Sequence, residues 1–313
     1  MSSLPPPNEP GEFRRYRSRI RQLGYTLIEM VMVMVIVGAL AVIGGVFIVE
    51  PFRASADMAR RAALVDQADL ALDAVSREVR TALPNSVRTR MESGLVAVEL
   101  VSTRTGGRYR RLPESGGSGE TLNRAQPSDD RFDVLGGLPD IDEVVTRSSG
   151  TDCAGDNGDC ISIYNTSQTD FNVYAGDNIA AITGTSNNPG GSDQLAYNTG
   201  ASGPAFAAHS PRQRFFVIDT VISYVCDPGD GALRRYAGYG LQENQPLPGT
   251  GSPLDSGMTG LVAGNVASCE FEYQSGANAA AATRRGLLKM RLTLRDGGET
   301  VTLLAQAHVD NAP

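Results

Sequence analysis

The stretch that decides the fold is Gly24-Tyr25-Thr26-Leu27-Ile28-Glu29, which leads directly into the apolar run Met30–Val49. The run contains no charged residue. Glu29 therefore places one carboxylate at the edge of an apolar span, where an unpaired charge costs several kcal/mol. We expect a positively charged group to compensate this carboxylate.

The partner of Glu29 depends on whether the chain is cleaved. Arg19 and Arg21 lie just upstream. A cut after Gly24 would remove both arginines and leave the new amino group of Tyr25 as the nearest positive charge. An α-amine in the same helix, or on an adjacent copy, would then neutralise Glu29.

This stretch resembles the class III signal of type IV pilins and of type II secretion pseudopilins. In those proteins a prepilin peptidase cuts after the glycine and methylates the new N-terminus, and the glutamate guides docking into the growing filament. The resemblance makes Gly24 the cleavage residue, Tyr25 the N-methylated terminus and Glu29 the docking carboxylate.

Residues 1–24 form a basic leader. It carries five arginines against two glutamates, a net charge of +3, so the rest of the −7 chain carries −10. Basic residues on one side of an apolar run hold that side in the cytoplasm. The run Met30–Val49 would span roughly 30 Å as a helix, enough to cross a bilayer once. We expect a single-pass inner-membrane span at about residues 30–49 with the head in the periplasm.

Two other readings of this end of the chain stay open. An ordinary secretory signal would be cut after Ala54-Ser55-Ala56, but its apolar region is usually about 7–15 residues long, and here Pro51 and Arg53 intervene. A plain uncleaved anchor accounts for the hydrophobicity, but it leaves Gly24 and Glu29 without a purpose.

A second, amphipathic half follows the apolar run, so that residues 25–84 are expected to form one N-terminal helix. Pro51 should kink or locally unwind it, and Pro84 with Asn85 should stop it after Leu83. Apolar residues recur at spacings of three and four, which predicts one buried face. They are Leu64, Ala68, Ala71, Leu72, Val75, Val79, Ala82 and Leu83.

Residues 85–313 are predicted to form a globular head. Short β-type runs alternate with Gly-, Ser-, Asn- and Pro-rich segments, which indicates an antiparallel sheet. Residues 113–130 and 184–212 are interpreted as long surface loops. The turn Asp296-Gly297-Gly298 would join the last two runs as a hairpin. The runs are Leu95–Val101, Arg108–Leu112, Arg131–Leu135, Ile161–Tyr164, Phe215–Cys226, Leu233–Tyr239, Ser268–Tyr273, Leu287–Arg295 and Thr300–Val309.

Six segments of the C-terminal third carry a second resemblance: residues 215–218, 223–227, 233–236, 269–273, 286–288 and 308–313. They resemble the MshO-type minor pilin of mannose-sensitive haemagglutinin (MSHA) pilus systems. The J-type minor pseudopilins share the same plan. Together the two resemblances imply an α+β, pilin-like fold, in which the long N-terminal helix packs on an antiparallel β-sheet head with long loops.

All four cysteines lie beyond the membrane run, and an even number downstream of an export signal indicates disulfides in an oxidising compartment such as the periplasm. Three pairings are possible. We favour Cys226 with Cys269, which would tie two β-type runs, and Cys153 with Cys160, which would close a small loop.

The loop between Cys153 and Cys160 is acidic. Asp152, Asp156 and Asp159 supply hard oxygen ligands of the kind that calcium takes, and some pseudopilins bind calcium. The spacing does not fit an EF-hand, so we favour a solvated acidic turn and expect no cofactor.

Enzymatic and nucleic-acid roles have little support. The two histidines, His209 and His308, have no G-x-S-x-G elbow and no cysteine–histidine cluster beside them. The acidic balance of the chain does not suit nucleic acid.

We therefore expect a minor pilin, not an enzyme, whose partners are other pilin subunits, a prepilin peptidase, an inner-membrane assembly platform and the membrane. A pseudopilin of a type II secretion system and a membrane-anchored periplasmic binding protein are the alternatives.

Overall fold

The computed structural model describes residues 24–123, 130–147, 153, 158–167, 171–188, 191–198, 206–276 and 285–311. The chain divides into two compact units, Met1–Ala56 and Asp57–Pro313. The division falls inside the long helix α1 (Leu27–Arg80), so the second half of this helix belongs to the same unit as the sheets. The sequence had suggested a boundary between the helix and the head at residues 84 and 85.

Helix α1 continues without a break through Pro51, contrary to the expected local unwinding. A proline removes one backbone donor, and here the turns on either side continue the helix. α1 also ends at Arg80, earlier than the expected Leu83. Beyond it the Leu83 N–H donates to the Val101 carbonyl oxygen at 2.8 Å, so this backbone has already left the helix to pair with a strand.

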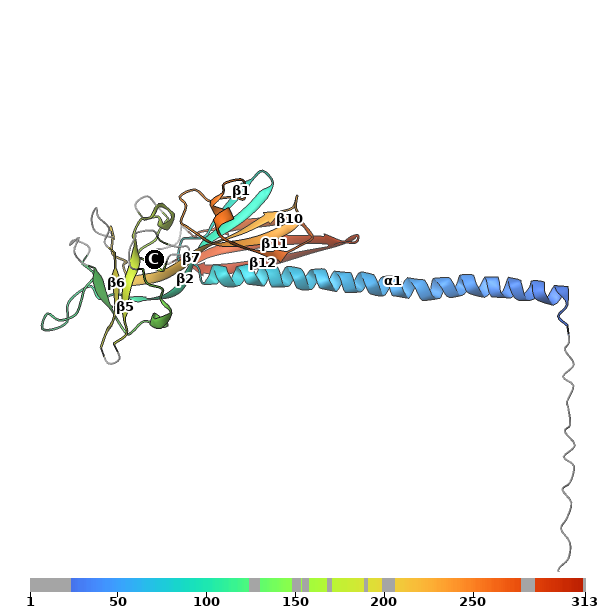
Figure 1. Ribbon diagram of the computed structural model, residues 1–313, viewed down its shortest axis with the longest axis horizontal. Coiled ribbons are helices and arrows are strands. Elements are labelled where there is room, and N and C mark those ends of the chain that lie inside the picture. Colours follow the sequence, from blue (N-terminus) through green and yellow to red (C-terminus); the bar gives the residue numbers. More distant parts are fainter. Residues whose placement is uncertain are drawn as a thin grey trace, which may run out of the picture. The chain divides into compact units, whose positions relative to one another are not determined.

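The strands of the head form two antiparallel sheets, where the sequence had suggested one (Figure 1). The larger sheet has the order β1-β2-β7-β4-β5-β6-β3, and β8 pairs with both β7 and β9; the smaller has the order β10-β11-β12. The strands are β1 Arg88–Glu92, β2 Leu95–Arg108, β3 Arg131–Val134, β4 Cys160–Ser162, β5 Ile179–Ser186, β6 Asp193–Tyr197, β7 Arg214–Asp227, β8 Ala232–Tyr239, β9 Met258–Ala263, β10 Val266–Gln274, β11 Arg285–Asp296 and β12 Glu299–Asp310.

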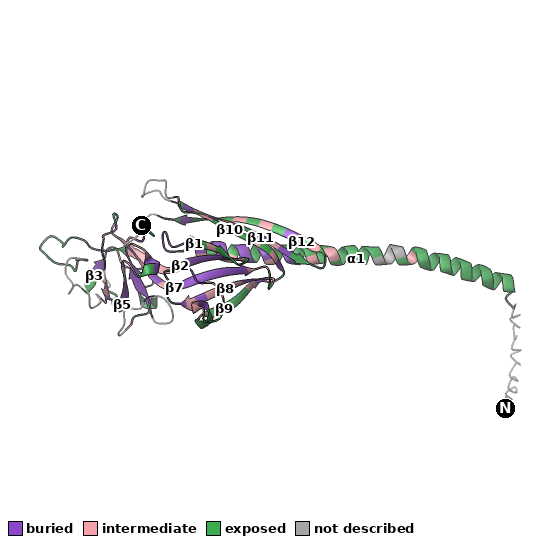
Figure 2. Cartoon of the chain, turned by 90° about the horizontal axis from the view of Figure 1, so that it is seen from above, coloured by how far each residue is buried: buried purple, intermediate pink, exposed green. Residues whose placement is uncertain are grey.

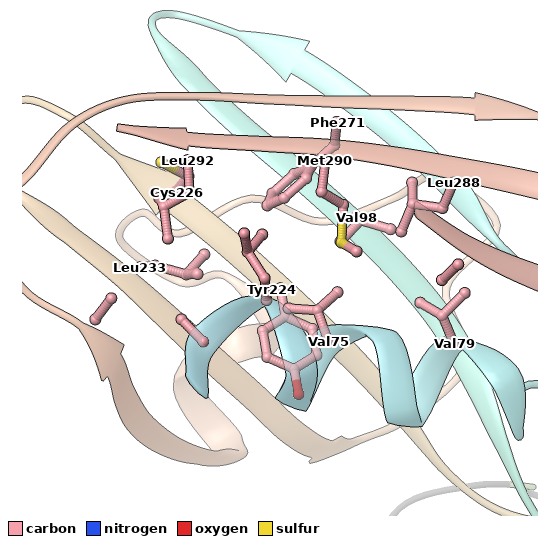
Figure 3. Packing of buried hydrophobic residues seen from close by; sticks show 14 of the residues in the cluster. Val75, Val79, Val98, Tyr224, Cys226, Leu233, Phe271, Leu288, Met290 and Leu292 are labelled. Atoms are coloured by element: carbon pink, nitrogen blue, oxygen red, sulfur yellow. The ribbon is translucent and has the colours of Figure 1, made fainter. Parts of the chain in front are cut away.

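The apolar face predicted for the second half of the helix is buried at every position named for it, from Leu64 to Val79 within α1 and at Ala82 and Leu83 just beyond its end. In one cluster Val75 and Val79 lie with Val98 of β2, Tyr224 of β7 and Met290 of β11 (Figure 3). The helix shares this cluster with residues of both sheets, and Figure 2 shows buried strands in purple beside it. This burial is the hydrophobic driving force that fixes the helix on the head.

Polar contacts add orientation to this packing. Glu78 of α1 accepts a hydrogen bond from the Tyr224 hydroxyl at 2.7 Å and one from Arg235 Nε at 3.0 Å. Because Tyr224 lies on β7 and Arg235 on β8, a single carboxylate joins the helix to two adjacent strands.

Strand β7 is buried on both faces, which explains its nearly continuous apolar sequence. Ile222 and Tyr224 face the cluster that contains α1, and Val221 and Val225 face a second cluster with Leu83. A third cluster fills the part of the head that contains β3, β5 and β6 and includes Tyr109, Phe132, Ile161 and Phe215.

The C-terminal hairpin is confirmed. β11 pairs with β12 from Arg285↔Asp310 to Asp296↔Glu299, and the turn residues Gly297 and Gly298 both have positive φ, 55° and 91°. Such a turn favours glycine at both central positions. Leu288, Met290, Leu292 and Leu294 are at most 1% exposed, so they share the buried face.

Two expectations for the head were wrong. The proposed loop 184–212 contains the end of β5 and all of β6, whose Leu195 and Tyr197 are buried. These short runs lie among glycine, serine and asparagine residues, so the alternation of apolar and polar residues in them is not evident from the sequence. The proposed strand Arg108–Leu112 is not a separate element, because Arg108 ends β2 and Tyr109 forms an isolated bridge with Val134.

Candidate functional site

The start of α1 is fixed by Thr26. The Glu29 N–H donates to the Thr26 hydroxyl at 3.3 Å and to its carbonyl oxygen at 3.1 Å, and α1 begins at the next residue, Leu27. A threonine that accepts from the backbone three residues later is an N-cap. Threonine followed three residues later by glutamate is the capping-box pattern, a signal in the sequence that could have identified Thr26.

Glu29 lies in the first turn of α1, where the helix dipole favours a negative side chain. The described residues provide no lysine, arginine or histidine within ion-pair distance of its carboxylate. All the ion pairs among them are formed by residues in the range 57–291, well beyond Glu29 in the sequence. Arg19 and Arg21, the upstream candidates, lie outside the described residues. The helix dipole thus favours a negative charge at this position, but no side chain among the described residues neutralises it.

The apolar half of α1 is exposed on all sides from Leu27 to Ile43. Leu27, Met34 and Val42 are 84%, 73% and 70% exposed, and the large apolar residues between them are also exposed. α1 is the one helix in the described part of the chain that is long and apolar enough to cross a membrane. A helix that is apolar all round needs an apolar environment, which a bilayer or a bundle of like helices provides.

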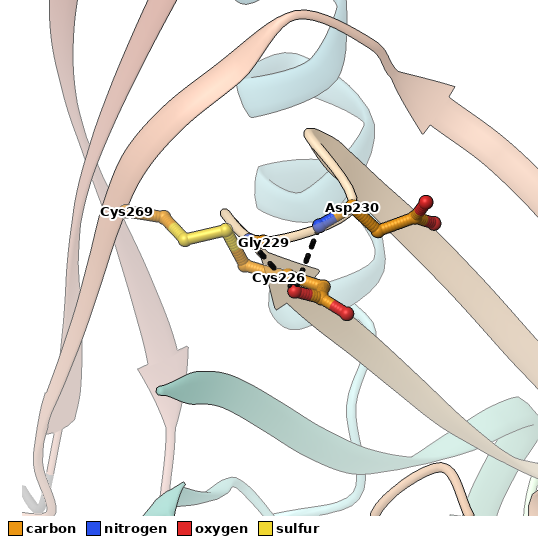
Figure 4. The surroundings of a disulfide bond; sticks show 5 residues. Cys226, Gly229, Asp230 and Cys269 are labelled. Carbon is orange, nitrogen blue, oxygen red and sulfur yellow. Dashed lines mark hydrogen bonds between the residues drawn. A yellow bond between two sulfur atoms is a disulfide. The ribbon is translucent and has the colours of Figure 1, made fainter. Parts of the chain in front are cut away.

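A disulfide joins the two sheets of the head. Cys226 at the end of β7 is bonded to Cys269 in β10, with Cα atoms 6.5 Å apart (Figure 4). Asp227 next to it accepts from the backbone N–H groups of Gly229 and Asp230 at 2.8 and 3.1 Å, which shapes the β7–β8 turn.

The second disulfide, Cys153–Cys160, has a Cα–Cα distance of 5.6 Å. Of the three aspartates considered as calcium ligands, Asp152 and Asp156 lie outside the described residues. Asp159 is buried, and its carboxylate accepts from Arg104 Nε at 2.7 Å and from the Val145 N–H at 3.0 Å. Burial raises the pKa of Asp159, while Val145 and Arg104 act in the opposite direction.

No group of three or more His, Cys, Asp or Glu residues that could hold a metal occurs among the described residues. The Asp159 carboxylate is buried and paired with Arg104, so this residue is not part of a solvated turn, contrary to the expectation. His209 Nδ1 lies 3.1 Å from the Tyr109 hydroxyl, with the two rings stacked. His308 lies exposed on β12.

The C-terminal motif holds a structural contact that the sequence did not reveal. Asn311 is fully buried, and its side chain accepts from the Asn85 N–H at 2.9 Å. It donates to the Tyr273 hydroxyl at 2.7 Å and to the Ser275 carbonyl oxygen at 3.0 Å. The end of the chain is therefore fastened to the segment that follows α1.

The family model described as the prokaryotic N-terminal methylation motif matches residues 19–45. Comparisons with curated proteins and with solved structures found no match. The matched residues include Gly24, Tyr25 and Glu29 and reach into the exposed apolar half of α1. The match supports a type IV pilin-like class III signal, and with it a type IV pilin or pseudopilin. Such a motif implies membrane anchoring, contact with other pilin subunits and processing by a prepilin peptidase, and it is typical of structural proteins.

Proposed function

We propose that this chain is a minor pilin of the MshO type, which is processed by a prepilin peptidase and takes part in the initiation or assembly of an MSHA-type pilus. The observation that carries the proposal is Glu29, a carboxylate at the first turn of a helix whose apolar residues are exposed on all sides as far as Ile43. The methylation motif over residues 19–45 supports the same reading.

The proposed mechanism follows from the free-energy cost of an unpaired Glu29 carboxylate in apolar surroundings. The chain is anchored in the inner membrane with its head in the periplasm, and cleavage after Gly24 exposes the amine of Tyr25. When an assembly platform moves the subunit out of the bilayer, its apolar helix packs against the helices of neighbouring subunits. The amine of a neighbour then pairs with Glu29, which removes the penalty of an unpaired charge in apolar surroundings.

A J-type pseudopilin of a type II secretion system is the second candidate, since the same motif and helix serve both classes. The two differ in what is lost when the chain is deleted. Loss of surface pili with normal protein secretion favours the pilus, whereas loss of secretion with normal pili favours the secretion system.

The docking role is tested by Glu29→Ala in cells, with the amount of this chain in sheared filaments measured by immunoblot. Glu50→Ala is the matched control because it removes a carboxylate from the same helix, beyond the apolar run. We expect the Glu29 variant to be cleaved and inserted normally, but to enter filaments at least about tenfold less. Breaking an ion pair in apolar surroundings costs about 3–5 kcal/mol.

Normal incorporation of the Glu29 variant would contradict docking through this carboxylate. An equal loss in the Glu50 variant would also contradict it, since the effect would then belong to the helix in general.

A further inference from the structure

A groove in the head is lined by arginines that have no acidic partner among the described residues. It has a volume of about 610 Å³ and lies where β2 ends and β7 begins. Its lining includes Arg108, Arg212 and Arg214. In the described part of the chain none of these three forms an ion pair, whereas other arginines of the head, such as Arg104, Arg110 and Arg235, each contact a carboxylate.

Two of these arginines lie directly opposite each other on the adjacent strands β2 and β7. Arg108 and Arg214 are directly paired in the β2–β7 ladder, so both side chains project from the same face. Like charges in directly opposite positions destabilise a sheet. In addition, Arg108 Nε donates to the Arg212 carbonyl oxygen at 3.2 Å, which holds this guanidinium beside the third arginine. An anion placed between Arg108 and Arg214 would remove the repulsion.

The groove continues over a glycine floor to an aromatic ring. Gly106 is paired with Phe216, two residues along β7 from Arg214 and on the same face. A Cβ at Gly106 would lie 3.0 Å from the Phe215 carbonyl oxygen and 3.2 Å from Phe216 Cδ1, so a side chain there would crowd the ring. Phe216 is half-buried. The groove thus offers a cationic end and an apolar end about two strand residues, or roughly 7 Å, apart.

We propose that this groove binds an acidic, extended peptide segment, with a carboxylate between Arg108 and Arg214 and an apolar side chain, two residues further on, against Phe216. The planar guanidinium fork matches a carboxylate, and alternate side chains of an extended peptide have the spacing of the two ends. The chain beyond Gly24 carries a net charge of −10. Its long-range field opposes densely charged polyanions, so a peptide with few acids fits better than an acidic polysaccharide. The proposed function enters only here, because it makes another pilin subunit the source of this segment.

The test uses the full-length chain in detergent micelles and two fluorescein-labelled synthetic peptides. One has an aspartate and a phenylalanine two positions apart, and the other has asparagine in place of aspartate. Arg108→Gln and Arg214→Gln remove the groove charges. Arg111→Gln is the matched control, because it removes the same charge from an exposed arginine that does not line the groove. Arg214→Lys keeps the charge but loses the fork.

We expect the aspartate peptide to bind wild type and each groove variant, including Arg214→Lys, to bind about tenfold more weakly, the effect of losing one charge-assisted contact. Arg111→Gln should stay within about twofold. Without peptide, Arg214→Gln should have a melting temperature at or above that of wild type, because it removes the like-charge pair.

Equal affinity for the two peptides would overturn the proposal, as would binding that is insensitive to Arg108 and Arg214. Binding of oligogalacturonate in place of the peptide, lost in the same variants, would show an acidic polysaccharide as the occupant and would overturn it as well. None of these measurements depends on leader cleavage or on Glu29, so failure here is distinguishable from failure of the proposed function.

Discussion

Asn311→Ala tests whether the end of the chain is a structural fastening. The change removes three side-chain hydrogen bonds, to Asn85, Tyr273 and Ser275. Each is worth about 1 kcal/mol, and a buried donor left without a partner costs about 1–3 kcal/mol. The Asn85 N–H is the donor with least access to water, since this residue is 9% exposed. We therefore expect the free energy of unfolding to fall by about 3–4 kcal/mol.

The assay is urea unfolding of the full-length chain in detergent, followed by far-UV circular dichroism because the chain has no tryptophan. With an m-value of about 3 kcal/mol/M, the midpoint should fall by about 1 M urea. Gln306→Ala, an exposed change on strand β12, which ends just before Asn311, should cost less than about 0.5 kcal/mol. A loss below about 1 kcal/mol for Asn311→Ala, or one equal to that of the control, would refute the fastening.

Three further predictions concern charge, cross-linking and processing. Burial raises the pKa of Glu99 despite its ion pair with Arg88, so its contribution to stability is present at low pH and is lost as pH rises above the usual carboxyl value. The urea midpoint of Glu99→Gln should therefore rise relative to that of wild type as the pH increases above the usual carboxyl value, and a difference that stays constant or moves the other way would contradict this. Replacing Cys226 and Cys269 by serine should cost about 4 kcal/mol by the loop-closure relation for a separation of 43 residues, and an unchanged urea midpoint would contradict it. Gly24→Phe should leave the leader attached, and a processed product of normal mass would argue against cleavage at this residue.

The sequence contained most of the information for the helix and the last hairpin. The spacing of Leu64, Ala68 and Val75 identified the buried face of α1, because a helix that packs on one side needs that period. The Gly297-Gly298 turn specified the β11–β12 hairpin, because few residues other than glycine adopt its backbone.

Other elements depend on pairing across long distances in the chain. β6 has only five residues, and its alternation shows only once Leu195 and Tyr197 lie in a core. The second sheet could not be inferred either. Nothing in the sequence indicates that β10 belongs to a different sheet from β7. The Cys226–Cys269 bond links these two strands, but it does not reveal that they lie in separate sheets.

The candidate sites also differ in whether they depend on neighbouring residues in the sequence or on pairing between distant strands. Gly24, Tyr25 and Glu29 lie within six consecutive residues, so their motif was recognisable without a structure. Arg108 and Arg214 lie far apart in the chain, and only the register of β2 with β7 makes them neighbours.

The most direct test of the account is the N-terminus of the membrane-bound protein, determined by mass spectrometry of the purified chain. The account predicts a chain that begins at N-methylated Tyr25. A chain that begins at Met1 would mean a plain anchor, and one that begins at Asp57 would mean an ordinary secretory signal. Either result would contradict the compensation of Glu29 by a newly formed amino terminus, on which the proposed assembly depends.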